Sequence, residues 1–370
     1  MGHQVKEPFL VSTGMTFFLV HGMQVGIGAL SFQRAIVKIS GYDGWISIII
    51  AGIVVQIIIA LMYALLNRAN GDLISVHDDI FGKWLGGVFS VIFGVYLLLL
   101  AVVILRIYIQ IVQAWVFHDL PTWIITLILA WIFYLLISGG FRKVVGICFL
   151  GVIVPAPLFT ILLMPLEFGH FINMLPIWKH TLSELIAGAK EASLSYLGFE
   201  ILLLCYPFIK QREKSHKWAQ LGGLMTIFAY TSLMVISLAF YSEEQLHRTI
   251  WATLTLFKVV EFPFIERFEY IGISLWLLLI SPNIALPVWG ASRIGKRVLG
   301  INQRTVLVFV IAILALITMF LQTSQEIETL ALWVSEFGFY FVGVYVPLLV
   351  MVYLAVSHLR SGADEKTTTS

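Results

Sequence analysis

The sequence is short of charge. Only 12% of its 370 residues are Asp, Glu, Lys or Arg, about half the share of a soluble globular domain, whereas 59% are hydrophobic. Positive and negative charges nearly cancel, to a formal net charge of +2, so the composition favours neither nucleic acid nor an acidic protein as the main partner. A water-soluble fold cannot hide this much apolar surface. We therefore predict an all-α integral membrane protein.

Cysteines and catalytic motifs are also scarce. The two cysteines, Cys148 and Cys205, both lie in apolar runs, and their spacing fits neither a disulfide framework nor a metal site. The sequence contains no nucleophile elbow, no zinc-ligand spacing and no phosphate-binding loop. We therefore predict that the protein is not an enzyme and holds no cofactor or metal.

Long apolar runs, by contrast, are abundant. A helix needs roughly 20 mostly apolar residues to cross the hydrocarbon of a bilayer. We predict ten spans: Phe9 to Ser31, Trp45 to Leu66, Leu85 to Val116, Thr122 to Ser138, Val144 to Leu166, Leu185 to Ile209, Trp218 to Tyr241, Tyr270 to Trp289, Val306 to Leu321 and Leu332 to Ser357. They form one transmembrane domain over residues 1–358, followed by a polar tail at 359–370.

Lys and Arg indicate the orientation of the chain. If the N-terminus lies in the cytoplasm, most of these residues fall in cytoplasmic loops, and an even number of spans places the C-terminus there too. Two basic loops, Lys210 to Lys217 and Arg293 to Arg304, are most simply explained as topology determinants near anionic lipid. Docking sites for a partner are the alternative.

Two connections are too long to be simple turns. The first, Glu167 to Ser195, carries an amphipathic pattern that predicts a half-helix facing water. Its polar positions are Glu184, Gly188, Glu191 and Ser195, and its apolar positions are Leu182, Leu185, Ile186, Ala189 and Ala192. The second, Ser242 to Glu269, mixes charged and aromatic residues and is predicted to be either a short helical lid or an ordinary structured loop.

The most informative feature is a pair of interruptions, one in the first span and one in the sixth. Gly26 and Gly28 follow Gly22 in the first, and Gly198 precedes the lone acid Glu200 in the sixth. Each glycine weakens a helix by roughly 1 kcal/mol relative to alanine. Interruptions at matching places in two halves are typical of an inverted repeat with a ligand between the breaks. The alternative is that these glycines only permit close helix packing.

An unwound turn also has a chemical use. It leaves peptide N–H and C=O groups without helical partners, at a cost of several kcal/mol each in hydrocarbon. Such a turn persists beside protein, water or a ligand, and half-helix ends supply partial charges that suit carboxylate or ammonium groups. We therefore predict that a small polar ligand binds near the middle of the bilayer.

Arg106 and Glu200 are the charges deepest in the predicted spans. Because a charge at that depth needs a partner or a wet cavity, we expect the two to pair directly or through water. Gln110 and Gln113 extend the Arg106 face and suggest a polar pathway leading outward. The alternative is a buried pair that only fixes helix packing. Asn283, beside Pro282, is a weaker candidate for the site, and His21 is a weak candidate for a proton carrier.

Several local strings occur together in a specific order: Gly26-Ile27-Gly28 before Arg34, Tyr42-Asp43-Gly44-Trp45, Phe81-Gly82-Lys83-Trp84-Leu85-Gly86, Asn173-Met174-Leu175-Pro176, Leu197-Gly198-Phe199-Glu200 and Ile265-Glu266-Arg267-Phe268-Glu269. In this order the chain resembles, over nearly its whole length, the GerAB-type endospore germination permeases, the B subunits of nutrient germinant receptors. These belong to the amino acid–polyamine–organocation superfamily.

The resemblance implies a LeuT-like fold of ten helices in a 5+5 inverted repeat, at about 9–166 and 183–357, with helices 1 and 6 broken. It implies the spore inner membrane or cell membrane as location, a receptor A subunit and a lipoprotein C subunit as partners, and a nutrient as ligand. The implied pocket comprises Gly26, Gly28, Leu100, Leu197, Gly198, Glu200 and Asn283. Family members can carry an acid two positions before Arg106, where this chain has Ile104.

Three functions remain open at this stage. The main hypothesis is a germinant-sensing subunit that passes a ligand-dependent change to its partners. The second is an amino-acid permease, either uncoupled or coupled to protons through Glu200. The third is a membrane scaffold with an inert pocket, which a bulky substitution at Gly26 would test.

Overall fold

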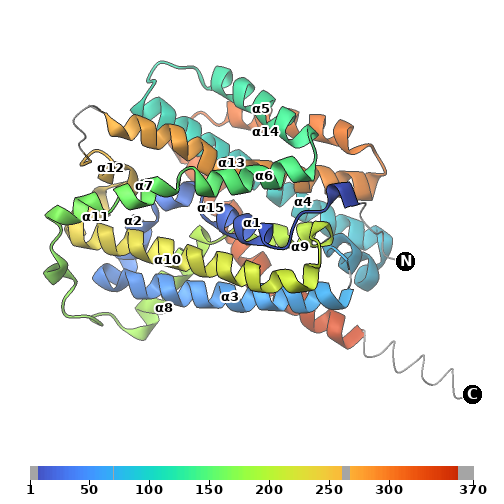
Figure 1. Cartoon of the computed structure of the whole chain (residues 1–370), viewed down its shortest axis with the longest axis horizontal. Coiled ribbons are helices and arrows are strands. Elements are labelled where there is room, and N and C mark those ends of the chain that lie inside the picture. Colours follow the sequence, from blue (N-terminus) through green and yellow to red (C-terminus); the bar gives the residue numbers. More distant parts are fainter. Residues whose placement is uncertain (1–6, 70, 261–266, 357–370) are drawn as a thin grey trace, which may run out of the picture.

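The computed structural model describes residues 7–69, 71–260 and 267–356, and this part of the chain is almost entirely helical. The long helices run along a common axis and form an elongated bundle (Figure 1). The α-helices are α1 (Met15–Gln24), α2 (Phe32–Ser40), α3 (Gly44–Ala69), α4 (Leu73–Trp115), α5 (Thr122–Ser138), α6 (Phe141–Ile153), α7 (Ala156–Ile161), α8 (Leu182–Ser195), α9 (Leu202–Cys205), α10 (His216–Phe240), α11 (Glu243–Arg248), α12 (Ala252–Leu256), α13 (Phe268–Leu299), α14 (Gln303–Phe320) and α15 (Ser324–Tyr340).

Among the described residues, seven helical stretches are long and apolar enough to cross a membrane. They are Phe32–Ala69, Leu73–Trp115, Phe141–Phe168, Arg212–Phe240, Phe268–Leu299, Gln303–Phe320 and Ser324–Val356. Large apolar side chains cover their outer faces; Phe228 is 66% exposed and Phe320 is 79% exposed. Outward-facing rings of this kind suit lipid and not water. The prediction of an all-α, multi-pass membrane protein is therefore confirmed.

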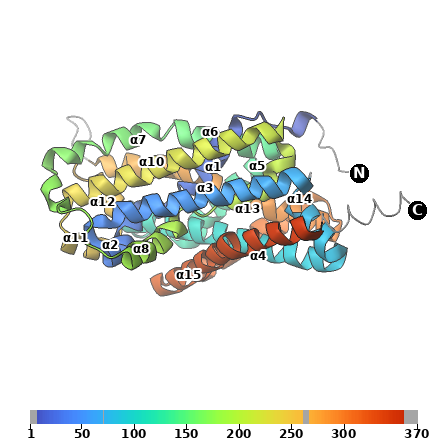
Figure 2. The ribbon, with the colours of Figure 1, turned by 90° about the horizontal axis from the view of Figure 1, so that it is seen from below.

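The centre of the bundle is formed by α4 and α13, which pack along each other, and by α10, which packs against both α1 and α3. Figure 2 shows α3 and α10 running side by side, with α15 lying against α4. Glycine permits the tightest of these contacts. A Cβ on Gly222 of α10 would lie only 2.7 Å from the carbonyl oxygen of Phe17 in α1.

Helix α4 begins earlier than the predicted third span, which starts at Leu85. The helix runs from Leu73, but Gly82 breaks its geometry with φ 76° and ψ 166°. Asp72 caps its first turn by accepting a hydrogen bond from the Ser75 N–H at 3.1 Å. A short helical segment thus precedes the predicted start at Leu85, which lies just after the Gly82 kink.

The predicted half-helix in the first long connection exists as α8, but its faces differ from the prediction. Leu182 and Ile186, assigned to the apolar side, are 58% and 56% exposed. Gly188, assigned to the polar side, is buried, and a Cβ there would lie 2.6 Å from the Ser47 hydroxyl of α3. The missing side chain lets α8 approach α3 closely, so glycine defines a contact face that hydropathy assigned to water. The second connection forms two short helices, α11 and α12.

The N-terminal segment is joined to the chain that follows α9. The Val11 N–H donates to the Phe208 carbonyl at 2.9 Å, and the Lys210 N–H donates to the Val11 carbonyl at 2.9 Å, which forms an isolated parallel β-bridge with Ile209. Both ends of the described chain lie at the same end of the bundle (Figure 1). The predicted tail at 359–370 and the first two residues of the Ile265–Glu269 string lie outside the described residues.

Candidate ligand site at two interrupted helices

The first interruption lies between α1 and a short 3-10 helix, Ile27–Leu30. Val25 is extended, with φ −88° and ψ 103°, and Gly26 has φ −136° and ψ −147°. Regular α-helical geometry returns only in α2, from Phe32 onward. The peptide groups of this stretch therefore lack a regular helical ladder in the interior of the bundle.

The second interruption follows α8. Gly198 has φ 116°, which an L side chain rarely adopts, and a 3-10 turn, Phe199–Ile201, leads into α9. Glu200 lies in this turn and is fully buried. Its carboxylate accepts a hydrogen bond from the Gly198 N–H at 2.7 Å and another from the Tyr96 hydroxyl of α4 at 2.6 Å. The buried acid thus satisfies a peptide group that the break exposes.

The two interruptions touch. A Cβ on Gly198 would lie 2.5 Å from the carbonyl oxygen of Met23, so only a glycine fits there. The Tyr230 hydroxyl of α10 lies 3.0 Å from the carbonyl oxygen of Gln24 and 3.0 Å from that of Ser195. One phenol therefore contacts the last turn of both half-helices, and its single O–H is shared between two carbonyl oxygens at helix C-termini.

Asn283 of α13 completes the site. Its amide nitrogen donates to the Met23 carbonyl at 2.6 Å, and a Cβ on Gly26 would lie 3.2 Å from its side chain. The Asn283 amide oxygen is buried without a partner, and so are both the oxygen and the nitrogen of the Gln24 amide. Most buried polar atoms in proteins are hydrogen-bonded. Three unpaired polar atoms therefore lie on Gln24, which ends α1, and on Asn283, which contacts Met23.

The space beside the first interruption is small. A cavity of about 10 Å³ is lined by His21, Gly22 and Val25, among others, and has room for about one water molecule. The His21 ring nitrogen Nδ1 lies 2.9 Å from the Thr226 hydroxyl. The rest of its wall comes from α6, α7 and α13, and it includes neither Gln24 nor Asn283.

The remaining predicted pocket residues lie at the edge of this cluster. A Cβ on Gly28 would lie 3.7 Å from the Ser195 hydroxyl. A Cβ on Gly338 of α15 would lie 2.8 Å from Leu197 and 2.6 Å from the Tyr96 hydroxyl, so Leu197 and Tyr96 border the same glycine. Leu100 is half-buried one turn after Tyr96, on the same face of α4.

The prediction that Arg106 and Glu200 pair directly is wrong. The Arg106 guanidinium donates to the Leu321 carbonyl at 2.7 Å, at the C-terminal end of α14. Glu200 bonds Tyr96, and Arg106 follows Tyr96 by ten residues, which corresponds to roughly 15 Å along α4. Arg106 instead places a positive charge at a helix C-terminus, where the dipole favours it.

The polar stripe beyond Arg106 bonds to chain connections. Gln110 donates to the Ser324 hydroxyl at 2.9 Å, and Gln113 donates to the Leu120 carbonyl at 2.8 Å. These side chains attach α4 to the starts of α15 and α5. Conduction along the stripe stays a prediction. No group of three or more His, Cys, Asp or Glu side chains that could hold a metal ion occurs within the described residues.

Three residues of the site escaped the sequence reasoning. Tyr96 and Tyr230 lie in apolar runs. Tyr96 bonds Glu200, which is 104 residues away, and Tyr230 bonds Gln24, which is 206 residues away. No local pattern indicates such partners. Gln24 offers a usable signal, because it is an amide side chain two residues before Gly26 in a mostly apolar stretch.

Together, the helical bundle and the two touching interruptions define a multi-pass membrane protein of the LeuT-like fold. The chain is similar to the crystal structure of MhsT in complex with L-phenylalanine, with a TM-score of 0.59 over 92% of this chain and 87% of that one. Their sequences are 13% identical, so the likeness concerns the fold alone.

The chain belongs to the spore germination protein family whose model, described as "Spore germination protein", matches residues 10–327. It is 40% identical to the spore germination protein GerQB of Bacillus cereus over 96% of this chain and 99% of that protein. It is also 22% identical to the spore germination protein A2 of Bacillus subtilis, over 96% of this chain and 98% of that protein. The resemblance to GerAB-type germination permeases is thereby confirmed.

Proposed function

We propose that the chain is the nutrient-sensing membrane subunit of a spore germination receptor, and that it binds an amino acid or similar small polar ligand between its two interrupted helices. The observation that carries this proposal is the set of unpaired buried polar atoms on Gln24 and Asn283, at the point where the interruptions touch. A ligand with donor and acceptor groups satisfies these atoms, and that gain favours the bound state.

Ten spans in a 5+5 inverted repeat fit this role. Beyond the seven long stretches, α5 has 17 residues and falls just short of a typical span. The other two proposed spans are the interrupted ones: α1 with α2, which is divided from α3 within the stretch Phe32–Ala69, and α8 with α9. Repeats at about 9–166 and 183–357, within a domain at 1–358, place the two interruptions at matching positions. An even count puts both termini on one side, which the basic loops assign to the cytoplasm.

The signal follows from population shift. The Met23 carbonyl contacts both Asn283 and Gly198, and these contacts hold the two interruptions together. Tyr230 contacts the carbonyls of Gln24 and Ser195, one from each interrupted helix. A ligand that bonds the same peptide groups favours a separated arrangement by the difference between its affinities for the two states. We propose that an A subunit and a lipoprotein C subunit, in the spore inner membrane or cell membrane, receive this change.

An amino-acid permease is the second candidate. It is favoured by Glu200, a fully buried acid located in the interruption itself, where a proton or a ligand ammonium group could neutralise it. Such a permease moves its ligand across the membrane without any partner subunit.

Replacement of Gln24 by leucine tests the site. Leucine has a similar volume and removes two unpaired polar atoms, so the free protein stays folded, whereas nutrient affinity falls at least about tenfold because hydrogen bonds to the ligand are lost. Gln113→Leu is the matched control. Its amide bonds Leu120 and Thr122 far from the interruptions, so it lowers the melting temperature and leaves binding intact.

The measurement is binding across a panel of amino acids, sugars and nucleosides, with the partner subunits present. Equal affinity in wild type and Gln24→Leu for every nutrient that binds would contradict the proposed site.

A further inference from the structure

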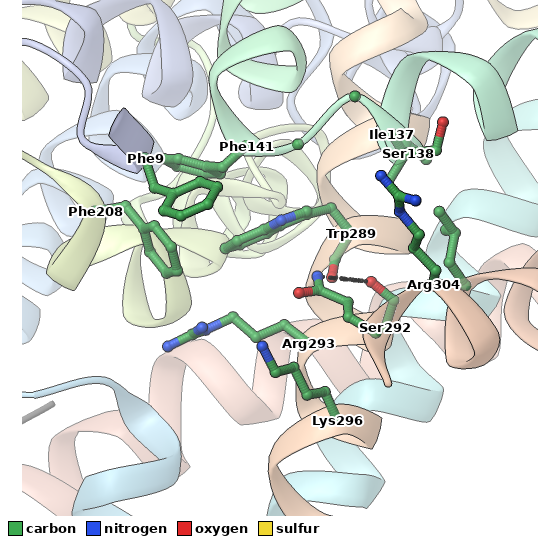
Figure 3. A pocket seen from close by; sticks show the side chains of 14 residues that line it. Phe9, Ile137, Ser138, Phe141, Phe208, Trp289, Ser292, Arg293, Lys296 and Arg304 are labelled. Atoms are coloured by element: carbon green, nitrogen blue, oxygen red, sulfur yellow. Dashed lines mark hydrogen bonds between the residues drawn. The ribbon is translucent and has the colours of Figure 1, made fainter. Parts of the chain in front are cut away.

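A second cavity, of about 360 Å³, lies away from the interrupted helices, beside the turn between α5 and α6 and the C-terminal part of α13 (Figure 3). Its volume lies in the range of small-molecule sites. Two kinds of side chain dominate its wall: the aromatic residues Phe141, Phe208 and Trp289, and the cationic residues Arg293, Lys296 and Arg304.

The aromatic residues form one continuous apolar wall. The Trp289 ring lies 4.5 Å from the Phe141 ring and 5.2 Å from the Phe208 ring, measured between centroids. Figure 3 shows these rings together on one side of the cavity, with Arg293 and Lys296 below them and Arg304 on the opposite side. The cavity therefore offers an apolar surface next to positive charge.

The charge of the cavity is not balanced within its wall. Arg293 is partly neutralised, because it donates to Asp72 at 2.8 Å and lies over the Phe208 ring. Lys296 and Arg304 have no acidic partner within 4.0 Å among the described residues. None of the residues that line the cavity, all of them described, is an acid. Two free cations facing one hollow attract a counter-ion.

We propose that this cavity binds a phosphate-bearing amphiphile, with the phosphate between Lys296 and Arg304 and the apolar part against Trp289. Lysine and arginine bind phosphate through charge-assisted hydrogen bonds. Ser292 and Gln303, which hydrogen-bond each other at 3.2 Å, add neutral polar groups at the same wall. The proposed cytoplasmic side carries anionic lipid, and basic pockets between spanning helices there hold lipid headgroups. A soluble organic phosphate shares the same chemistry.

The test uses the full-length protein in nanodiscs. Its melting temperature is compared in phosphatidylcholine alone, in phosphatidylcholine with phosphatidylglycerol, and in phosphatidylcholine with added glycerol 3-phosphate. If phosphatidylglycerol stabilises the protein and glycerol 3-phosphate does not, the ligand of the cavity is a lipid. If glycerol 3-phosphate stabilises it, the ligand is a soluble phosphate. The K296Q/R304Q variant is expected to weaken the apparent affinity roughly thirtyfold. Each Lys or Arg near an anionic headgroup contributes roughly fivefold in affinity, and the variant removes two of them.

Two further variants separate the cavity from general surface charge. K214Q/K217Q removes the same charge from the other basic loop and is expected to leave the response unchanged. K296R/R304K keeps the charge and is expected to retain binding, which excludes misfolding as the cause of a loss. Equal weakening in K214Q/K217Q and K296Q/R304Q, or no stabilisation of wild type by either phosphate source, would overturn the proposal.

Discussion

At the scale of single residues, Gly198 carries the largest constraint in the site. Its φ of 116° and the carbonyl oxygen 2.5 Å from an added Cβ exclude other side chains for two independent reasons. The residue also donates its N–H to Glu200. Contact between the two interruptions therefore depends on a position that has no side chain.

Replacement of Gly198 by alanine is expected to destabilise the protein by about 1–3 kcal/mol, through strain at a positive φ and displacement of Met23. Gly146→Ala is the control, because its Cβ meets nothing within 4 Å and it lies inside α6. Thermal unfolding of both variants in detergent measures the difference. If Gly198→Ala melted as Gly146→Ala does, the close contact at the interruption would be absent.

The sequence located the interruptions but paired the wrong charges. Gly26 and Gly198 could be recognised because glycine weakens a helix wherever it occurs. The depth of Arg106 could not be recognised from the sequence. Helix α4 has 43 residues and α14 has 18, so α4 extends past its neighbour. A position counted from one helix end does not fix depth in a bundle of unequal helices, and Arg106 meets the end of α14.

At the scale of elements, the two central helices α4 and α13 are linked at one end by an ion pair. Asp72 accepts a hydrogen bond from Arg293 at 2.8 Å, and Arg297 lies 3.7 Å away. Burial by itself raises the pKa of Asp72, but the two guanidinium groups and the Ser75 hydrogen bond outweigh burial and hold it below its ordinary value of 3.8.

This lowered pKa predicts an acid-dependent stability. The contribution of Asp72 is fully present above its unfolded pKa, near 4, and is lost as pH falls through the lower folded value. Asp72→Asn keeps a good helix cap but leaves Arg293 unpaired, so we expect a loss of about 3 kcal/mol at neutral pH. The loss should shrink below about pH 4.

Denaturation of wild type and Asp72→Asn across this pH range measures the effect, and Glu328→Gln, at an exposed position of α15, controls for general acidity. A constant difference between wild type and Asp72→Asn at every pH would contradict the assignment.

Element faces were harder to predict than element positions. Most predicted spans correspond to helices, because long apolar runs have one stable structure in lipid. The predicted contact face of α8 was wrong at Gly188. A hydropathy pattern ranks side chains by polarity, whereas glycine contributes to packing by having no side chain.

At the scale of the whole molecule, flux distinguishes the two candidate functions. A receptor subunit binds its nutrient without net transport, so purified chain in liposomes should show no nutrient-dependent uptake above protein-free liposomes. Glu200→Gln provides the comparison, since a proton-coupled permease loses uptake with this change whereas a leak does not respond to it. Nutrient uptake by wild type alone, abolished in Glu200→Gln, would favour the permease.

The bridge between Val11 and Ile209 has a mechanical consequence. It ties the segment entering α1 to the segment leaving α9 by two peptide hydrogen bonds, whatever the side chains are. The N-terminal half of the first broken helix, α1, and the C-terminal half of the second, α9, are thus joined through their flanking backbone. A displacement of the segment around Val11 is therefore expected to move both sides of the proposed ligand site together.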